Sequence, residues 1–194
     1  MPEVAVFAKA PIPGYAKTRL IPLLGPEGAA QVQARLVARA VATARAADVG
    51  AVSLWCAPDC SHPFFAELAV TLRGQPEGDL GARMLAAFEA AGGPLVLMGS
   101  DCPALGPDDL REAAAALAWA DVVIAPAEDG GYGLIAARRP QAQLFADMPW
   151  STAAVADRTR ARAAAAGLVL HELRTIWDVD TAADYERAVW AGLL

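Results

Sequence analysis

Lysine is nearly absent from this sequence. Of its 16 basic residues only Lys9 and Lys17 are lysines, and both fall in one loop near the N-terminus; all the others are arginines. A lysine ammonium is a compact point charge and an arginine guanidinium is a planar fork, so the two are not interchangeable at a tight phosphate site. The lysine pair therefore favours a phosphate-binding loop, with chance clustering as the alternative.

Positive charge is also scarce overall, because the formal net charge is −6. No basic stripe is present that could neutralise the phosphates of a nucleic-acid polymer, so such a partner is excluded. A mononucleotide needs only two or three cations and remains possible. The three cysteines lack C-x-x-C spacing, and the two histidines form no metal motif with Cys56 and Cys60. We expect reduced, buried thiols in a cytoplasmic protein.

Long apolar runs and a basic N-terminal region are missing as well. The first residues show no signal-peptide pattern, and no stretch is long enough to cross a membrane, so we expect no membrane insertion. The chain of 194 residues is 56% hydrophobic, which suits one globular domain over residues 1–194. Nothing in the sequence indicates the oligomeric state.

Predicted strands and helices alternate along the whole chain. Helical periodicity and capping residues indicate helices over 26–47, 58–68, 79–91, 107–119 and 151–167, with a last helix opened by a capping box of Thr181 and Asp184. Short apolar runs between them indicate strands over 4–8, 51–56, 69–73, 94–98, 121–126, 132–136 and 168–173. This alternation predicts a three-layer α/β fold around a mostly parallel central sheet.

The run over 94–98 reads as a buried central strand that ends at Gly99. It delivers Ser100 and Asp101 to the carboxyl end of the sheet, where ligands of open α/β folds bind. A carboxylate at this place points to function. The alternative is that Asp101 only caps the next helix, although residues 106–109 already provide a start for it.

The loop after the first strand carries three cations, Lys9, Lys17 and Arg19. Two prolines keep it extended, and Gly14 lets the backbone pass close to a ligand, so its composition is typical of a phosphate cradle. It is neither a Walker A loop nor a G-x-G-x-x-G loop. A merely solvated basic loop is the alternative.

Three further stretches are candidates for ligand contacts. Gln75, Gly78 and Arg83 surround the start of a helix, where a base, sugar or phosphate could bind; an ordinary capped helix is the alternative. Asp129, Gly130, Gly131 and Tyr132 form a glycine-rich turn that lets a ligand lie against the backbone, unless it is only a turn. In the third stretch we expect Ser151 or Thr152 to cap a helix and Trp150 to precede the cap.

Asp101 and Asp180 each follow a predicted strand, and three cations follow the first strand. Mg²⁺ takes one or two carboxylates together with phosphate oxygens and waters. The constellation therefore predicts a site for Mg²⁺ or Mn²⁺ and a di- or triphosphate, with Asp101, Lys17 and Asp180 as the catalytic residues. No Ser-His or Cys-His nucleophile set is visible, which suits direct transfer between substrates by positioning.

The order of these motifs resembles a known bacterial family of GT-A-type transferases. The shared motifs run from Lys9-Ala-Pro to Lys17-Thr-Arg19, through Gln75 to Arg83, Gly99-Ser-Asp101-Cys-Pro, Asp129-Gly-Gly-Tyr132 and Trp150-Ser-Thr152, to Asp178-Val-Asp180-Thr. Most members are uncharacterised and are labelled nucleotide-diphospho-sugar transferases or glycosyltransferases. More distantly the chain is similar to 2-phospholactate guanylyltransferase and to molybdenum-cofactor nucleotidyltransferases.

The resemblance implies a Rossmann-like GT-A fold and places Asp101 and Asp180 at the metal-ligand positions. The first loop departs from the nucleotidyltransferase pattern G-x-G-T-R, since only Gly14 and Lys17-Thr-Arg19 remain. Two activities are therefore expected, nucleotidyl transfer from an NTP, slightly favoured by the cationic loop, and glycosyl transfer from a nucleotide-sugar. In both, a small acceptor is expected against Asp129, Gly130, Gly131 and Tyr132, and against Trp150, Ser151 and Thr152. A non-catalytic nucleotide-binding protein is a third possibility.

Overall fold

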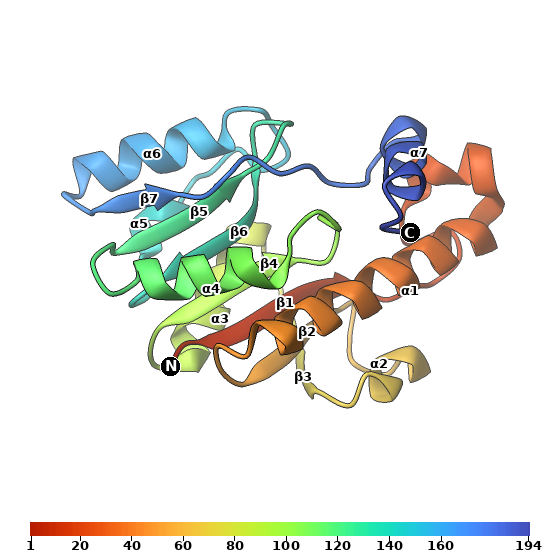
Figure 1. The fold of residues 1–194 in the computed structure, drawn as a ribbon, viewed down its shortest axis with the longest axis horizontal. Coiled ribbons are helices and arrows are strands. Elements are labelled where there is room, and N and C mark those ends of the chain that lie inside the picture. Colours follow the sequence, from red (N-terminus) through yellow and green to blue (C-terminus); the bar gives the residue numbers. More distant parts are fainter.

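The computed structural model describes residues 1–194 and contains one seven-stranded sheet in the order β3-β2-β1-β4-β6-β5-β7 (Figure 1). The strands are β1 (Glu3–Lys9), β2 (Val52–Ala57), β3 (Thr71–Gly74), β4 (Leu95–Gly99), β5 (Val122–Pro126), β6 (Tyr132–Ala137) and β7 (Leu170–Glu172). Only β6 runs antiparallel to its neighbours, β4 and β5. The predicted mostly parallel sheet is confirmed, and β5 and β6 form a hairpin across the predicted glycine-rich turn.

Helices cover both faces of this sheet. They are η1 (Thr18–Leu20), α1 (Ile21–Ala47), α2 (Pro63–Glu67), α3 (Leu80–Ala91), α4 (Pro107–Ala116), α5 (Ala142–Phe145), α6 (Val155–Ala165) and α7 (Ala182–Trp190). Alternate residues of β1 separate the two cores: Val4 and Val6 join the core under α1 and α4, whereas Ala5 and Phe7 join the core under α3, α5 and α6. The predicted three-layer architecture is therefore correct.

A third, smaller core lies where α7 meets the first half of α1 (Figure 1). Gly25, at φ 70° and ψ 169°, interrupts α1, so the long helix begins near Pro26, as expected, after an extra helical turn. The capping box of Thr181 and Asp184 starts α7.

Three local expectations are wrong. The expected cap at Ser151 or Thr152 does not exist, because α6 begins only at Val155 behind Ala154 and the Thr152 hydroxyl donates to the carbonyl of Pro149. The last strand covers only Leu170–Glu172, and the four-residue helix α5 was not foreseen. Trp150 does not precede a helix cap, since it packs on Phe145 and against Gly81 of α3. That packing keeps residues 148–154 in a loop.

The chain between β7 and α7 crosses the carboxyl end of the sheet (Figure 1). Ile176 forms a parallel bridge with Ala127, and the N–H of Val179 donates to the carbonyl of Asp101. This crossing brings Asp178 and Asp180 to the end of β4. No helix of the structure is both long and apolar enough to pass through a bilayer.

Candidate active site

A cleft of about 1030 Å³ opens at the carboxyl ends of the parallel strands, where ligands bind in open α/β sheets. Of the residues predicted for the site, the cleft is lined by Lys9, Lys17, Arg19, Gln75, Arg83, Ser100, Asp101, Asp129, Gly131, Tyr132, Trp150, Ser151, Thr152 and Asp180. Gly14, Gly78 and Gly130 lie outside its lining. The fold thus gathers side chains from six separate stretches of sequence at one place.

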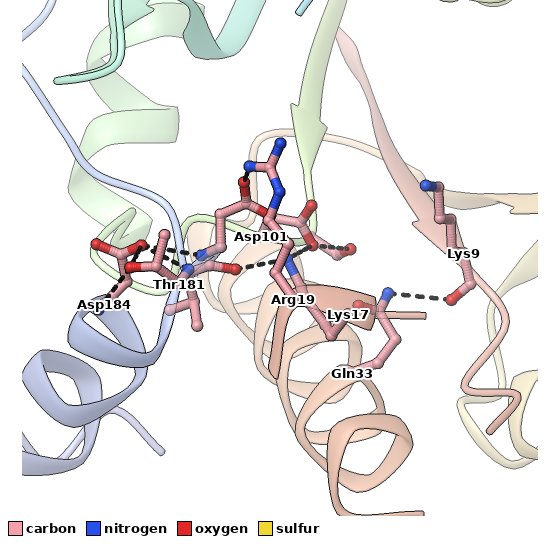
Figure 2. Close-up of polar contacts among 10 residues, drawn as sticks. Lys9, Lys17, Arg19, Gln33, Asp101, Thr181 and Asp184 are labelled. Atoms are coloured by element: carbon pink, nitrogen blue, oxygen red, sulfur yellow. Dashed lines mark hydrogen bonds and ion pairs between the residues drawn. The ribbon is translucent and has the colours of Figure 1, made fainter. Parts of the chain in front are cut away.

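Lys17 and Asp101 both line the cleft and are in direct contact (Figure 2). The Lys17 Nζ lies 2.9 Å from Asp101 Oδ1 and donates a second bond of 2.7 Å to the carbonyl of Val179. The Lys17 side chain is only 6% exposed, whereas that of Asp101 is 48% exposed. Lys17 also has a left-handed backbone, at φ 49°, which is uncommon for a residue with a side chain. The loop therefore points one buried ammonium at a half-exposed carboxylate.

Arg19 makes the second cation–carboxylate contact of this loop. Its guanidinium pairs with the carboxylate of Asp180, just before the capping box of α7. Lys9 lies apart from these pairs in Figure 2: its carbonyl accepts a 3.0 Å bond from the buried amide of Gln33, and its ammonium lies 5.9 Å from the Tyr15 ring. Gln33 was not foreseen, because a lone glutamine within a helix carries no sequence signal.

Asp101 does not cap the following helix. The N-terminus of α4 is served by Asp109, whose carboxylate accepts a 2.7 Å bond from the N–H of Gly106. The Ser100 hydroxyl lies 3.5 Å from Asp101 Oδ1, the limit for a hydrogen bond. The capping explanation for Asp101 is therefore wrong, and its carboxylate remains available to the cleft.

Asp178 is a site residue whose role the sequence did not specify. Burial is the main cause that raises the pKa of its carboxyl, and the nearby charges of Asp129 and Asp101 raise it further. Burial and the charge of Asp101 likewise raise the pKa of the Cys102 thiol, which keeps it protonated and a poor nucleophile. The motif Asp178-Val-Asp180 indicates a function in the sequence, because it contains two aspartates where a helix cap requires at most one.

These carboxylates fit a hard divalent cation. The charges of Asp129 and Asp101 disfavour the ionised form of Asp178, and a cation beside Asp178 would relieve that repulsion. The structure contains no group of three or more acidic, histidine or cysteine side chains arranged to hold a metal by themselves. In Mg²⁺ sites one or two carboxylates act together with phosphate oxygens and waters.

The start of α3 forms one wall of the cleft. Asp79 caps the helix, as expected, by accepting a 2.8 Å bond from the N–H of Ala82. The Gln75 amide donates to the carbonyl of Trp55 at 2.8 Å, and Arg83 Nε donates to the carbonyl of Gly78 at 3.1 Å. Both side chains reach the cleft, but their contacts with a nucleotide stay a prediction.

The opposite wall is built from the β5–β6 turn and the loop before α6. Asp129 Oδ1 accepts a 2.8 Å bond from the N–H of Gly131. A Cβ on Gly130 would lie 2.2 Å from the carbonyl oxygen of Ala153, so glycine lets the two loops touch. Tyr132 Oη and Trp150 Nε1 are both buried without a hydrogen-bond partner. The turn is therefore more than a strand connection, although its role toward an acceptor stays a prediction.

Gly133 was missed by sequence reasoning. A Cβ at this position would lie 2.4 Å from Cys102 Sγ and 2.5 Å from Ile176 Cδ1. Because glycine has no Cβ, Cys102 in the chain after β4 and Ile176 in the crossing segment can both pack against this position. The neighbouring glycines hid this signal, because a single glycine in a glycine-rich stretch does not stand out.

Comparisons with known proteins agree with this architecture. A crystal structure of a provisionally named nucleotide-diphospho-sugar transferase from Desulfovibrio desulfuricans G20 is 30% identical, with a TM-score of 0.89 over 99% of this chain and 88% of that one. A nucleotidyl transferase from Methanothermobacter is 19% identical, with a TM-score of 0.65 over 99% and 97% of the two chains. Rv0371c from Mycobacterium tuberculosis, in complex with manganese, is 17% identical, with a TM-score of 0.58 over 98% and 100%.

The two more distant structures establish only a shared fold, because their sequence identity to this chain is low. No curated protein matches the sequence. Residues 38–152, more than half of the chain, match the model of a family described as an uncharacterised protein conserved in bacteria, DUF2064. Together with the Desulfovibrio structure, this match confirms the resemblance found from the motifs: the chain belongs to the DUF2064 family and has the fold of nucleotidyl and nucleotide-sugar transferases.

Proposed function

We propose that this protein is a divalent-metal-dependent transferase that moves a nucleotidyl group from an NTP to a small acceptor. The observation that carries the proposal is the meeting of Lys17, Arg19, Asp101 and Asp180 in one cleft at the end of β1 and β4. Cations and carboxylates side by side are what a metal–polyphosphate complex requires.

Each part of the cleft has a task in this proposal. Asp101 and Asp180, with Asp178 nearby, would hold Mg²⁺ or Mn²⁺, and the bound metal would neutralise charge on the phosphates. Lys9, Lys17 and Arg19 bind the phosphate oxygens, with Ser100 beside Asp101. The wall at α3, with Gln75 and Arg83, faces the base and sugar. Gly14 and Gly78 support this half from outside the lining by keeping the two loops close to the ligand.

The acceptor binds on the opposite wall, against Asp129, Gly131, Tyr132 and the loop Trp150–Thr152, with Gly130 joining these loops. Strand order supports this division: β2 and β1 lie on one side of β4, and β6 and β5 lie on the other. An acceptor oxygen attacks the α-phosphate, and pyrophosphate leaves with the electrons of the broken bond. Positioning supplies most of the rate, because no covalent nucleophile takes part.

The structural relatives support a metal and a nucleotide in this fold. One distant neighbour is a nucleotidyl transferase and another was crystallised with manganese. Glycosyl transfer from a nucleotide-sugar is the second candidate, and the name of the Desulfovibrio relative favours it. The glycine-rich turn and Trp150 would then receive a sugar acceptor, while the metal would hold the departing nucleoside diphosphate.

A thermal-shift panel separates these candidates. The protein is heated with Mg²⁺ or Mn²⁺ and with each NTP, NDP and nucleotide-sugar in turn, since a ligand at 100 times its Kd adds about 2.7 kcal/mol to native-state stability. We expect a metal-dependent rise in Tm with one NTP that exceeds the rise with the corresponding nucleotide-sugar. The reverse order would establish the glycosyltransferase, and no rise with any member would contradict both.

A further inference from the structure

Both carboxylates proposed as metal ligands are already paired with cations of a single loop. Lys17 contacts Asp101 and Arg19 contacts Asp180, and the two cations are separated by only one residue (Figure 2). The third cation, Lys9 at the end of β1, has no ion pair with an acid. The loop thus places one cation on each proposed ligand.

The Lys17 pair is built into the fold and is not a chance surface contact. Exposed ion pairs contribute little, because water and salt screen them. The Lys17 side chain, however, is 6% exposed and its ammonium has a second acceptor, the carbonyl of Val179. Val179 in turn donates its N–H to the carbonyl of Asp101, so the segments that carry both acids define the position of the ammonium.

An ammonium at this position competes with a metal ion. It occupies a lone-pair direction of Asp101 Oδ1 at 2.9 Å, and its charge repels a dication bound to the same carboxylate. A polyphosphate changes this balance, because its oxygens accept hydrogen bonds from ammonium and guanidinium groups. Once Lys17 and Arg19 turn to the phosphates, both carboxylates become free for the metal that the phosphates carry.

We propose that Lys17 and Arg19 are exchangeable counter-ions that exclude free divalent cations from Asp101 and Asp180. The ligand that the cleft takes is then the metal chelate of a di- or triphosphate, and not metal first and nucleotide second. The inference rests on the proposed function, since it assumes that metal and phosphate share this cleft. By linkage, metal and polyphosphate must raise each other's affinity by the same factor.

Direct Mn²⁺ titration tests the exchange without any turnover. Free Mn²⁺ is followed by its electron paramagnetic resonance signal as the wild type, Lys17→Met and Lys9→Met are titrated in the absence of nucleotide. We expect the wild type to bind Mn²⁺ weakly and Lys17→Met to bind it about tenfold more tightly. A tenfold change lies within the usual range of coupling between two sites. Lys9→Met is the matched control, because it removes the same charge at the end of β1, where the lysine pairs with no acid, and therefore frees no carboxylate.

Two results overturn the inference: Mn²⁺ affinity in Lys17→Met no higher than in the wild type, or an equal gain in Lys9→Met, which would reveal only a net-charge effect. If Lys17→Met does not fold, Arg19→Gln replaces it, because the Arg19 side chain is 70% exposed. The expected gain is then about threefold, as befits an exposed pair, and no gain overturns the inference.

A second measurement distinguishes a failure of the counter-ion exchange from a failure of the proposed transferase function. Inorganic tripolyphosphate and Mn²⁺ are added to the wild type singly and together, and Tm is recorded. We expect the pair to raise Tm by more than the sum of the separate effects, and a merely additive rise overturns the exchange. Absence of any rise with the pair counts against the proposed function itself, whereas the Mn²⁺ titrations decide the exchange alone.

Discussion

Asp101 connects three parts of the molecule through separate atoms. Its carboxylate contacts Lys17 of the first loop, its carbonyl accepts from Val179 of the crossing segment, and its backbone continues from β4. Position in the sequence suggested this residue because a lone acid after a buried strand has little structural use. The partner Val179 could not be foreseen, because an apolar residue's main-chain hydrogen bond leaves no trace in the side-chain pattern.

The Asp101→Asn variant tests the catalytic role. It keeps the shape of the side chain but removes the charge that a metal and Lys17 require. We expect turnover to fall by at least about 100-fold, similar to the loss of one electrostatic group in other active sites. Stability should drop by about 1–2 kcal/mol, because Lys17 loses its counter-charge while Asp101 itself is half exposed.

Steady-state assays with the nucleotide identified in the thermal-shift panel, together with a melting curve, measure both effects. Ser61→Ala is a suitable control, since this exposed residue lies outside the cleft. Wild-type turnover in Asp101→Asn would remove this carboxylate from the mechanism.

At the scale of elements, α6 is held to the sheet by charge as well as by packing. Arg160 of α6 donates to both carboxylate oxygens of Glu172 in β7, at 2.7 Å and 2.8 Å. The hydrogen bond from Arg160 is the main cause that lowers the pKa of Glu172. The sequence predicted α6 and β7 but not their pairing, because two charges twelve residues apart have many possible partners.

The pH dependence of stability follows from this shift. A carboxyl group whose pKa is lower in the folded state stabilises the protein above its unfolded pKa, and the effect disappears as pH falls through the folded value. Glu172→Gln should therefore lower Tm by about 1–3 °C at pH 6, because both partners are more than a third exposed and the pair contributes no more than about 1 kcal/mol.

The difference from the wild type should shrink as pH falls toward about 3, where the wild-type carboxyl is also neutral. Melting curves at intervals between these pH values measure it. Glu186→Gln serves as control, because Glu186 is exposed on α7 and forms no ion pair. A difference that stays constant with pH would mean that Glu172 acts through packing and not through its charge.

At the scale of the whole molecule, the core under α1 and α4 shields two of the three thiols. Cys56 and Cys102 are buried and Cys60 is half buried. Burial and the neighbouring Cys60 raise the pKa of Cys56 to about 12, so little reactive thiolate forms near neutral pH. All three cysteines are free, in agreement with the expectation of reduced thiols, although Cys60 is less buried than expected.

Alkylation by iodoacetamide at pH 8, read by mass spectrometry, should therefore add one label to the native protein, at Cys60. The labels at Cys56 and Cys102 should appear together, and only when denaturant unfolds the whole chain, because both residues belong to one continuous core. Cys60→Ser should remain unlabelled in the native state. Labelling of Cys56 without global unfolding would indicate that β3 and β2, at one edge of the sheet, open separately.

Most strands and helices, the burial of both faces of the sheet and the stretches at its carboxyl end can be predicted from local sequence patterns. Periodicity, caps and glycine–proline punctuation are local properties, so they can be read without knowing what lies nearby in space. For the same reason Lys17, Asp101 and Asp180 were identified as candidates before any contact between them was known.

Long-range packing, in contrast, sets which cation meets which acid, brings Asp178 near Asp101 and Asp129, and keeps Ser151 and Thr152 in a loop. These features depend on the segment between β7 and α7 crossing the sheet, and on Trp150 packing against Gly81. Both are contacts between residues far apart in the chain. Such contacts are selected by the packing of the whole molecule, which no local pattern encodes.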